Sequence, residues 1–368
     1  VERAQMGGEC LHTGCVPSKA LLAAAARGES FTDAYAHVRR AIDAIAPHDS
    51  RERFEGLGVR VIAGEARFAG PRRIIAGETE ICARRFVIAT GSKPVLPPLP
   101  GLADIPALTN ETLFTEQPAP RHLLILGGGP VGVEMAQAFR SLGSEVSLVE
   151  EGKILPRDDA ELVAVMRDRL VTEGVALHEQ CRAIGVERVG RDIRLGCQAA
   201  AGGEVALTGS HLLIAAGRKA NIDALDLDAA GVAAGDGAIK LDARLRTSNK
   251  RIFAIGDVAG PYRFTHMAGY QAGIVLRNAL FRLPAKADYC AVPWVTYGDP
   301  ELAHVGLSES VAREAGMQFK VLRHSYADND RAVAEGRTEG FLKAVVSPGG
   351  RILGASIVGV AAGEIIHA

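Results

Sequence analysis

The sequence predicts an α/β fold, and three features of its pattern indicate this class. Alanine-rich segments with helical spacing alternate with short Val, Ile and Leu runs bounded by glycine, which is typical of parallel sheets covered by helices. A glycine turn joins a buried strand to a helix after residue 126. The length of 368 residues and the hydrophobic content of 48% are sufficient for two or three domains, each with its own core.

The overall composition is that of an ordinary globular protein. The formal net charge is -1, so the sequence predicts neither a nucleic-acid partner nor attachment to a membrane surface. No apolar run approaches the length of a membrane span, and no signal-peptide pattern opens the chain. We therefore expect a cytoplasmic protein without membrane contacts.

The most informative segment is 7–19, GGECLHTGCVPSK, which holds Cys10 and Cys15 in a glycine-rich turn at a helix start. In a regular helix, a rise of roughly 1.5 Å per residue would place these Cα atoms about 7.5 Å apart, beyond the usual disulfide span. The backbone must therefore deviate, and Gly14 would permit this. The apolar run 20–26 continues the helix, so Cys15 lies near the positive end of a helix dipole, which favours a thiolate. The segment predicts a redox-active pair.

Two other interpretations of this pair are a structural disulfide in a secreted protein and half of a metal site. Six cysteines in the whole chain are too few for a disulfide scaffold, and no second closely spaced pair completes a zinc tetrad. We expect no resident metal. The other four thiols should be buried and inert, namely Cys82, Cys181, Cys197 and Cys290.

The remaining elements follow in order along the chain. Residues 34–46 carry apolar side chains at helical spacing, and 59–63 and 85–89 are predicted strands. The stretch 93–106 contains five prolines and is predicted to be irregular. A strand, a glycine turn, a helix and a second strand then occupy 121–151. We place domain boundaries near residues 118, 249 and 290.

The glycine turn after residue 126 has the pattern G-x-G-x-x-G of a dinucleotide site. Its glycines allow a tight turn, close approach of a pyrophosphate and close packing of the helix. Glu150 ends the second strand, where a carboxylate accepts from a ribose hydroxyl and repels a 2'-phosphate, so NADH is favoured over NADPH. The alternative is that the glycines only pack helix on strand. The predicted turn residues are Gly127, Gly129, Pro130, Val131 and Gly132.

A second nucleotide site is predicted from the first residues. Glu2 lies where a ribose would bind if the sequence starts roughly thirty to forty residues into another dinucleotide-binding unit. The alternative is an exposed terminal residue.

Together, these motifs resemble those of the class I pyridine nucleotide-disulfide oxidoreductases, the group of lipoamide dehydrogenase, glutathione reductase and mercuric reductase. The resemblance covers essentially the whole chain, because three more motifs match: IATGS at 88–92, AAGR at 215–218 and RIFAIGD at 251–257. It implies two Rossmann-like nucleotide-binding domains, for FAD and NAD, and a C-terminal α+β dimerisation domain. The implied ranges, with both ends of the family fold missing, are FAD domain 1–118, NAD domain 119–249, return to the FAD domain 250–290 and dimerisation domain 291–368.

The resemblance also implies residue roles. Cys15 would lie nearest the flavin, and Cys10 would be the outward-facing thiol that attacks the substrate. Lys19 would pair near the flavin with Glu134, although an exposed lysine and a surface glutamate are the alternative. His12 is expected to be a loop residue rather than a base. The other residues implied for the FAD and NADH sites are Gly8, Thr90, Gly91, Ser92, Gly217, Asp257, His266, Met267 and Ala268.

The function expected from this resemblance is reduction of a small-molecule disulfide or a metal ion by a FAD-dependent, NADH-using homodimer. Lipoamide dehydrogenase-like and mercuric reductase-like activities are not separable, because the family's C-terminal base and any metal-handling cysteines would lie beyond Ala368, and His367 is not that base. Glutathione reductase fits less well, since it prefers NADPH and carries lysine where Ser18 stands. The alternative from another class is a redox sensor or inactive remnant without turnover.

Overall fold

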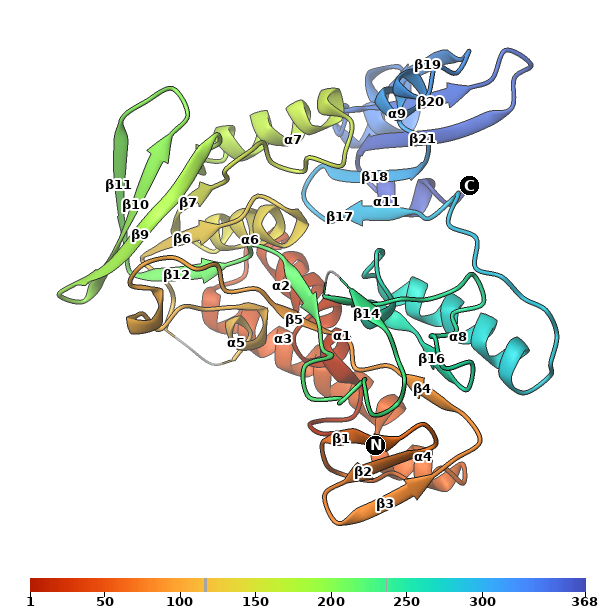
Figure 1. Ribbon diagram of the computed structural model, residues 1–368. Helices are drawn as coiled ribbons and strands as arrows, with labels where there is room; N and C mark the ends of the chain where they lie inside the picture. Colours follow the sequence, from red (N-terminus) through yellow and green to blue (C-terminus); the bar gives the residue numbers. More distant parts are fainter. Residues whose placement is uncertain (116–117, 236) are drawn as a thin grey trace. The chain divides into compact units, whose positions relative to one another are not determined.

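The computed structural model describes residues 1–115, 118–235 and 237–368, and its backbone divides into two compact units (Figure 1). The first unit comprises Val1–Val16, Arg40–Val95 and Arg218–Tyr289; the second comprises Pro17–Arg39, Leu96–Gly217 and Cys290–Ala368. Helices α2 and α3 each continue from one unit into the other. This division follows backbone contacts alone, so the four sequence ranges assigned to domains stay a prediction.

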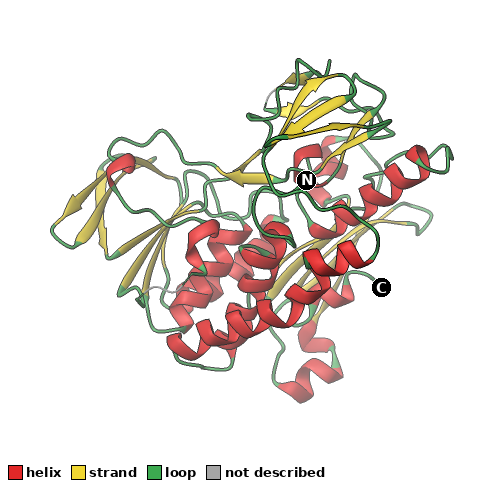
Figure 2. Ribbon diagram, turned by 90° about the horizontal axis from the view of Figure 1, so that it is seen from below, coloured by secondary structure: helices red, strands yellow, loops and turns green. Residues whose placement is uncertain are grey.

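The first unit contains small sheets and the long helix α8. Its strands form an antiparallel sheet β1-β2-β3 near the N-terminus (Figures 1 and 2), a parallel pair β16-β4, and two antiparallel pairs. The element bounds are α1 Gly8–His12, η1 Ala46–Asp49, α4 Arg51–Gly56, β1 Ala66–Gly70, β2 Arg73–Ala76, β3 Thr79–Cys82, β4 Phe86–Ile88, β5 Ser92–Pro94, β13 Arg218–Ala220, β14 Ala234–Gly235, β15 Ala238–Ile239, β16 Ile252–Ala254, η3 Gly256–Ala259 and α8 Thr265–Ala279.

The second unit is built on a parallel sheet with the order β12-β6-β7-β8. A three-stranded antiparallel sheet, β11-β10-β9, and a five-stranded antiparallel sheet, β17-β18-β21-β20-β19, complete it. The element bounds are η2 Leu102–Asp104, α5 Asn110–Leu113, β6 His122–Leu126, α6 Pro130–Ser141, β7 Glu145–Val149, α7 Ala160–Thr172, β8 Ala176–His178, β9 Cys181–Val189, β10 Asp192–Ala199, β11 Glu204–Gly209, β12 His211–Ile214, β17 Trp294–Thr296, β18 Glu301–Gly306, α9 Glu309–Glu314, β19 Lys320–Ser325, η4 Tyr326–Asp328, α10 Asp330–Glu335, β20 Phe341–Val346, β21 Ile352–Gly359 and α11 Ala362–Ile365, with α2 Cys15–Ala26 and α3 Phe31–Ile45 shared between units.

The predicted strand, turn, helix and strand at 121–151 are confirmed as β6, α6 and β7. Leu123, Leu124 and Ile125 are fully buried, as are Leu148 and Val149, because neighbouring elements cover both faces of a parallel sheet. Leu124 and Val149 belong to a hydrophobic cluster that also includes residues of β9, β10 and β12. This core fixes the strand ends from which the glycine turn and Glu150 extend.

Three predictions about elements are corrected by the structure. Residues 59–63 are not a strand, because Ala63 makes a single parallel bridge with Glu2 and has no longer ladder. The stretch 93–106 is not wholly irregular: it starts within β5, which pairs with β13, and contains η2. Cys82 and Cys290 are exposed, whereas the predicted burial of Cys181 and Cys197 is confirmed. Within the described ranges, no helix combines the length and apolarity that crossing a bilayer requires.

The second unit buries charged groups where α7 meets the five-stranded sheet. The Lys343 ammonium is 3% exposed and lies 2.7 Å from Asp159, 2.6 Å from Glu309 and 3.3 Å from Glu161. Next to this cluster, the indole of Trp294 donates to Asp158 at 2.8 Å, and burial raises the pKa of Asp158 to about 6. The buried lysine is therefore compensated by three carboxylates, while Asp158 is more easily protonated in the folded chain than in the unfolded one.

Replacing Asp158 with Asn should stabilise the protein more at pH 8 than at pH 5. Because the pKa of Asp158 is raised in the folded chain, the protein loses unfolding free energy as the pH rises above the ordinary pKa of an aspartate and through about 6. An amide does not ionise and so avoids this loss, while its oxygen still accepts from the Trp294 indole. The gain in unfolding free energy at pH 8 should be at most about 3 kcal/mol. Calorimetric unfolding temperatures at both pH values measure it, with exposed Asp104→Asn as the control. An equal gain at the two pH values would contradict the prediction.

Candidate functional site

Cys10 and Cys15 lie on two consecutive helices of the cysteine segment. Cys10 is in α1, which follows Gly7 (φ 93°) and begins at Gly8 (φ 62°), and Cys15 begins α2. The predicted deviation from one regular helix is thus a break between α1 and α2. Gly14 does not adopt a positive φ; its role is close approach, since a Cβ there would lie 3.0 Å from the carbonyl oxygen of Glu9.

The hydroxyl of Thr265 contacts both sulfurs. It donates to Cys10 Sγ at 3.1 Å and lies 3.2 Å from Cys15 Sγ, and the two thiols also hydrogen-bond each other. The sequence therefore placed the two sulfurs together correctly, but it did not identify Thr265, which begins α8 and is 250 residues away from Cys15. The only available signal was its position directly before His266.

The two thiols are electrostatically unequal. The hydrogen bond with Cys15 and burial raise the pKa of Cys10, and the hydrogen bond from Thr265 partly opposes this rise. Negative charge on the pair is therefore favoured at Cys15 rather than at Cys10. Cys10 was expected to be the outward-facing thiol, but Cys15 is exposed and Cys10 is only partly exposed. Cys10 is the less exposed thiol because it packs beside Thr265 and Cys15.

A charged network connects the cysteine segment to the other motifs of the first unit. Arg218 lies 2.5 Å from the carboxylate of Glu9, which directly precedes Cys10. Its Nε donates to Ser92 Oγ at 2.8 Å, and that hydroxyl donates to Asp257 at 2.6 Å. Sequence reasoning selected Ser92 and Asp257 but missed Glu9 and Arg218, because the partners are about 200 residues apart in sequence.

The other residues expected at a FAD site also lie in the first unit. Thr90 and Asn221 hold each other through reciprocal side-chain to backbone hydrogen bonds of 2.7 and 3.0 Å. Gly8 and Gly91 both have positive φ with no atom within 4 Å of the place where a Cβ would stand. This open glycine surface beside a fixed carboxylate at Asp257 fits a nucleotide cofactor.

The start of α8 and Glu2, which are also expected at the FAD site, match the expectations only in part. Helix α8 begins at Thr265, so His266, Met267 and Ala268 form its first turn as expected. Met267 is buried, and the backbone N–H groups of Met267 and Ala268 already donate to the carbonyl oxygen of Phe264. The Glu2 carboxylate accepts from the backbone N–H of Ala4 at 2.9 Å, and the Glu2 backbone pairs with residues 62–64. The role of Glu2 at a ribose stays a prediction.

The glycine turn of the second unit has the geometry of a dinucleotide loop. Gly127 has φ 117°, and a Cβ on Gly132 would overlap the Gly127 carbonyl oxygen. Gly129 faces open space, and α6 begins with Pro130 and the exposed Val131. These features leave room at the helix N-terminus for a pyrophosphate. Gly217, also with φ 117°, is likewise open.

The Glu150 carboxylate is attached to this loop. One oxygen accepts from the Gly128 N–H at 2.6 Å and the other from the Gly152 N–H at 2.9 Å. The charge is therefore held at the end of β7 beside the glycine turn, as a ribose-binding carboxylate would be. Its selection of NADH stays a prediction.

Lys19 and Glu134 form the expected contact within the second unit. The Lys19 ammonium lies 2.8 Å from Glu134, and the other oxygen of Glu134 accepts from the backbone N–H of Tyr297 at 3.0 Å. Glu134 is 3% exposed, so it is not the surface glutamate of the alternative interpretation. Lys19 also lies 4.5 Å from the centre of the Tyr297 ring, which gives it a cation–π contact.

Two further expectations concern histidine and metals. His12 belongs to α1 rather than to a loop, and its Nε2 lies 2.8 Å from the carbonyl oxygen of Met6, so the ring has a structural contact. Among the described residues, no cluster of three or more His, Cys, Asp or Glu side chains is arranged to bind a metal ion.

Replacing Thr265 with Val should move the ionisation of the cysteine pair to higher pH. The hydroxyl hydrogen bond favours thiolate, so its loss should slow alkylation of the reduced pair by iodoacetamide about threefold to tenfold at pH 7. Thr265→Ser keeps the hydroxyl and is the matched control. Rates measured from pH 5 to 10, with peptide mapping, give the profile. Identical profiles for the Val and Ser variants would refute the role of the hydroxyl.

Comparisons with known proteins agree with this geometry. The family model described as pyridine nucleotide-disulphide oxidoreductase matches residues 1–272, and the model of its dimerisation domain matches 292–368. A mercuric reductase from Streptomyces lividans is 35% identical, with 100% of this chain and 83% of the relative covered. A dihydrolipoyl dehydrogenase from Thermus scotoductus is 36% identical, with the same coverage of 100% and 83%.

A solved structure gives the same result for the fold. The Cu(II) complex of the HOCl-induced flavoprotein disulfide reductase RclA from Escherichia coli superimposes with a TM-score of 0.92 at 29% identity, and the match covers 100% of this chain and 85% of that one. The expected fold class, with FAD- and NAD-binding-like domains and a C-terminal dimerisation domain, is confirmed. The chain belongs to the pyridine nucleotide-disulfide oxidoreductase family, whose members bind FAD and NAD(P)H.

Proposed function

We propose that this protein is a reductase that uses NADH and FAD to reduce the Cys10–Cys15 pair, which then reduces a small-molecule disulfide or a metal ion. The observation that supports this function most directly is the placement of both thiols on the Thr265 hydroxyl at 3.1 and 3.2 Å. Two thiols that share one hydroxyl partner suit the formation and breaking of a disulfide between them. When bound, NADH would supply a hydride, and FAD would carry its electron pair to that disulfide.

The chemistry assigned to the chain's own residues is thiol–disulfide exchange. Cys10 loses its proton and attacks one sulfur of the acceptor disulfide, which releases the first product thiol and leaves a mixed disulfide on Cys10. Cys15, where negative charge is favoured, then attacks Cys10 Sγ and releases the second product thiol. Each turnover thus consumes one dithiol and one acceptor disulfide, and yields the Cys10–Cys15 disulfide and two thiols. Thr265 is proposed to keep both sulfurs beside one hydroxyl for the second step.

Charged side chains are assigned supporting roles in this scheme. Asp257, oriented by Ser92, and the open turns at Gly8 and Gly91 are proposed to hold FAD. Lys19, fixed by the buried Glu134, is proposed to place a positive charge beside the flavin in the same helix as Cys15. The ordering of Lys19 by a buried carboxylate restricts the direction of its ammonium group.

The acceptor and the assembly are also proposals. Relatives named mercuric reductase and dihydrolipoyl dehydrogenase match this chain about equally, so both a metal ion and a disulfide are kept as acceptor classes. The match to a dimerisation domain at 292–368 supports a homodimer. A redox sensor without turnover is the second candidate, favoured by the fact that the cysteine pair and its network do not by themselves require an acceptor site.

The two cysteines should behave differently when each is replaced by Ser. In the purified flavoprotein reduced with NADH, Cys15→Ser should abolish the long-wavelength thiolate-to-flavin absorbance, whereas Cys10→Ser should preserve it, because the thiolate is favoured at Cys15. Both variants should lose turnover of lipoamide or Hg(II) by about 1000-fold or more, since the thiols act as a unit. Absorbance spectra and NADH consumption measure these effects. The reverse spectra would reverse the assigned roles, and a wild-type protein that is reduced without turnover of either acceptor would indicate the sensor.

Replacing Glu150 with Gln should narrow the preference for NADH over NADPH. The amide still accepts from the Gly128 N–H but no longer repels a 2'-phosphate, so the ratio of kcat/KM values should fall about tenfold. Glu151→Gln removes the same charge from the exposed neighbouring residue and should leave the ratio unchanged. Steady-state kinetics with both nucleotides measure the ratio. An unchanged ratio in Glu150→Gln would mean that another residue reads the ribose.

A further inference from the structure

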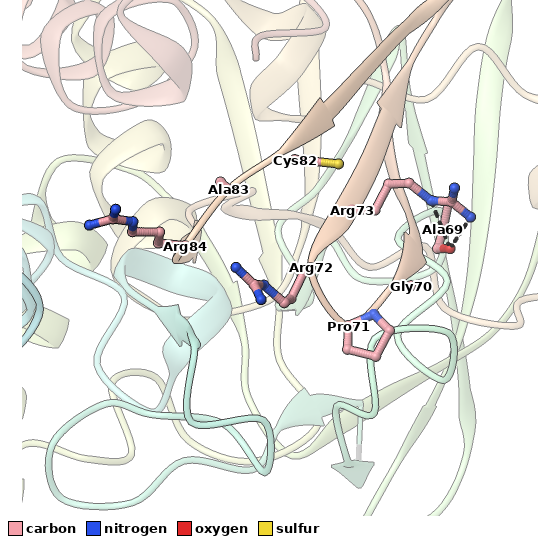
Figure 3. A pocket seen from close by; sticks show the side chains of 8 residues that line it. All are labelled: Ala69, Gly70, Pro71, Arg72, Arg73, Cys82, Ala83 and Arg84. Carbon is pink, nitrogen blue, oxygen red and sulfur yellow. Dashed lines mark hydrogen bonds between the residues drawn. The ribbon is translucent and has the colours of Figure 1, made fainter.

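A basic pocket of about 530 Å³ opens in the first unit on the three-stranded sheet β1-β2-β3 (Figure 3). It is separate in sequence from the cysteine segment and from the glycine turn. Three arginines and no carboxylate contribute to its lining, which consists of Ala69, Gly70, Pro71, Arg72, Arg73, Cys82, Ala83 and Arg84.

Of the three arginines that line the pocket, Arg73 is held by contacts within the sheet. Its Nε and Nη2 donate to the carbonyl oxygen of Ala69 at 3.3 and 3.1 Å, as the dashed lines in Figure 3 show, and its Nη1 lies 3.5 Å from Glu80. The thiol of Cys82 lies 3.9 Å from the same Glu80 carboxylate. Both side chains are therefore engaged on one face of the hairpin.

Arg72 and Arg84 have no such partner. Within the ranges that the structure describes, neither guanidinium makes a hydrogen bond or an ion pair, and both residues are exposed. Their backbones are fixed beside each other, because the carbonyl oxygen of Arg72 accepts from the N–H of Ala83 at 3.3 Å. Figure 3 shows both guanidinium groups extending to the same side, away from Arg73.

Neighbouring segments add to this positive charge. Arg85 and Arg251 are also exposed and, among the described residues, also lack a side-chain partner. The N–H of Phe86 donates to the Arg251 carbonyl oxygen at 3.0 Å, which places these two segments side by side. The turn itself is anchored, since the Asn249 amide donates to the carbonyl oxygen of Pro71 at 3.1 Å. Four uncompensated arginines on a fixed scaffold attract an anion, although the whole chain carries a net charge of only -1.

We propose that this pocket is a binding site for a small phosphate-bearing molecule, held by Arg72 and Arg84. A guanidinium group offers paired N–H donors that match two phosphate oxygens, and two such groups on adjoining backbone segments suit a di- or polyphosphate. The volume lies within the usual range for small-molecule sites. Ala69, Pro71 and Ala83 provide apolar walls for the uncharged part of the ligand. The site is independent of the redox pair and does not rest on the proposed reaction.

The proposal is tested by calorimetric titration of the FAD-bound protein with inorganic pyrophosphate, in excess NAD⁺ to occupy the glycine turn of the second unit. The wild type should bind, and the double variant Arg72→Gln/Arg84→Gln should bind at least about tenfold more weakly, because each charged hydrogen bond lost costs about this factor. Arg188→Gln/Arg191→Gln removes the same charge from exposed arginines on the β9–β10 hairpin and should bind like the wild type.

The outcomes separate a built site from general attraction. Loss confined to Arg72→Gln/Arg84→Gln supports the pocket. No binding to the wild type, equal affinity in all three proteins, or equal weakening in both double variants overturns it. Flavin absorbance and circular dichroism of each variant confirm that the exposed substitutions leave the fold and the FAD site intact.

Discussion

The contact on which the proposed site depends is that of one hydroxyl with two sulfurs. Thr265 begins α8, and its side chain lies within hydrogen-bond distance of Cys10 and Cys15, which belong to two other helices. The contact brings the start of a 15-residue helix to the cysteine segment.

Charge compensation explains why the surrounding motifs are spread over the chain. Glu9, Arg218 and Asp257 come from three separate segments, and Ser92 joins them. A half-buried carboxylate next to a thiol would oppose formation of a thiolate, so pairing Glu9 with an arginine reduces that cost. The same logic applies to Glu134, which is buried and neutralised by Lys19. In both cases the cation that pairs with the acidic group comes from a segment distant in sequence.

The sequence predicted features that depend on local rules and missed those that depend on distant partners. The glycine turn at Gly127 and its flanking strands follow from hydrophobic runs and glycine geometry, so they were predicted correctly. Residues 59–63 have strand composition but find only Glu2 as a bridge partner, and composition does not show this. Pro94 ends a short strand because β13 supplies the ladder from more than 120 residues away. Thr265 and Glu9 were missed for the same reason, since their partners become visible only in the folded chain.

The chemistry of a dithiol is compatible with both acceptor classes proposed for this chain. Two adjacent thiolates are good nucleophiles toward a disulfide and are also soft ligands that bind thiophilic metal ions, so the core chemistry does not choose between these acceptors. Selection must therefore come from groups that meet the acceptor as it approaches Cys10. In this chain the charged residue nearest to Cys10 in sequence is Glu9, and its ion pair with Arg218 reduces the negative potential around the thiol. An acceptor that displaces Arg218 from Glu9 would meet a carboxylate, which suits a cation, whereas one that leaves the pair intact would meet a nearly neutral surface, which suits an uncharged disulfide.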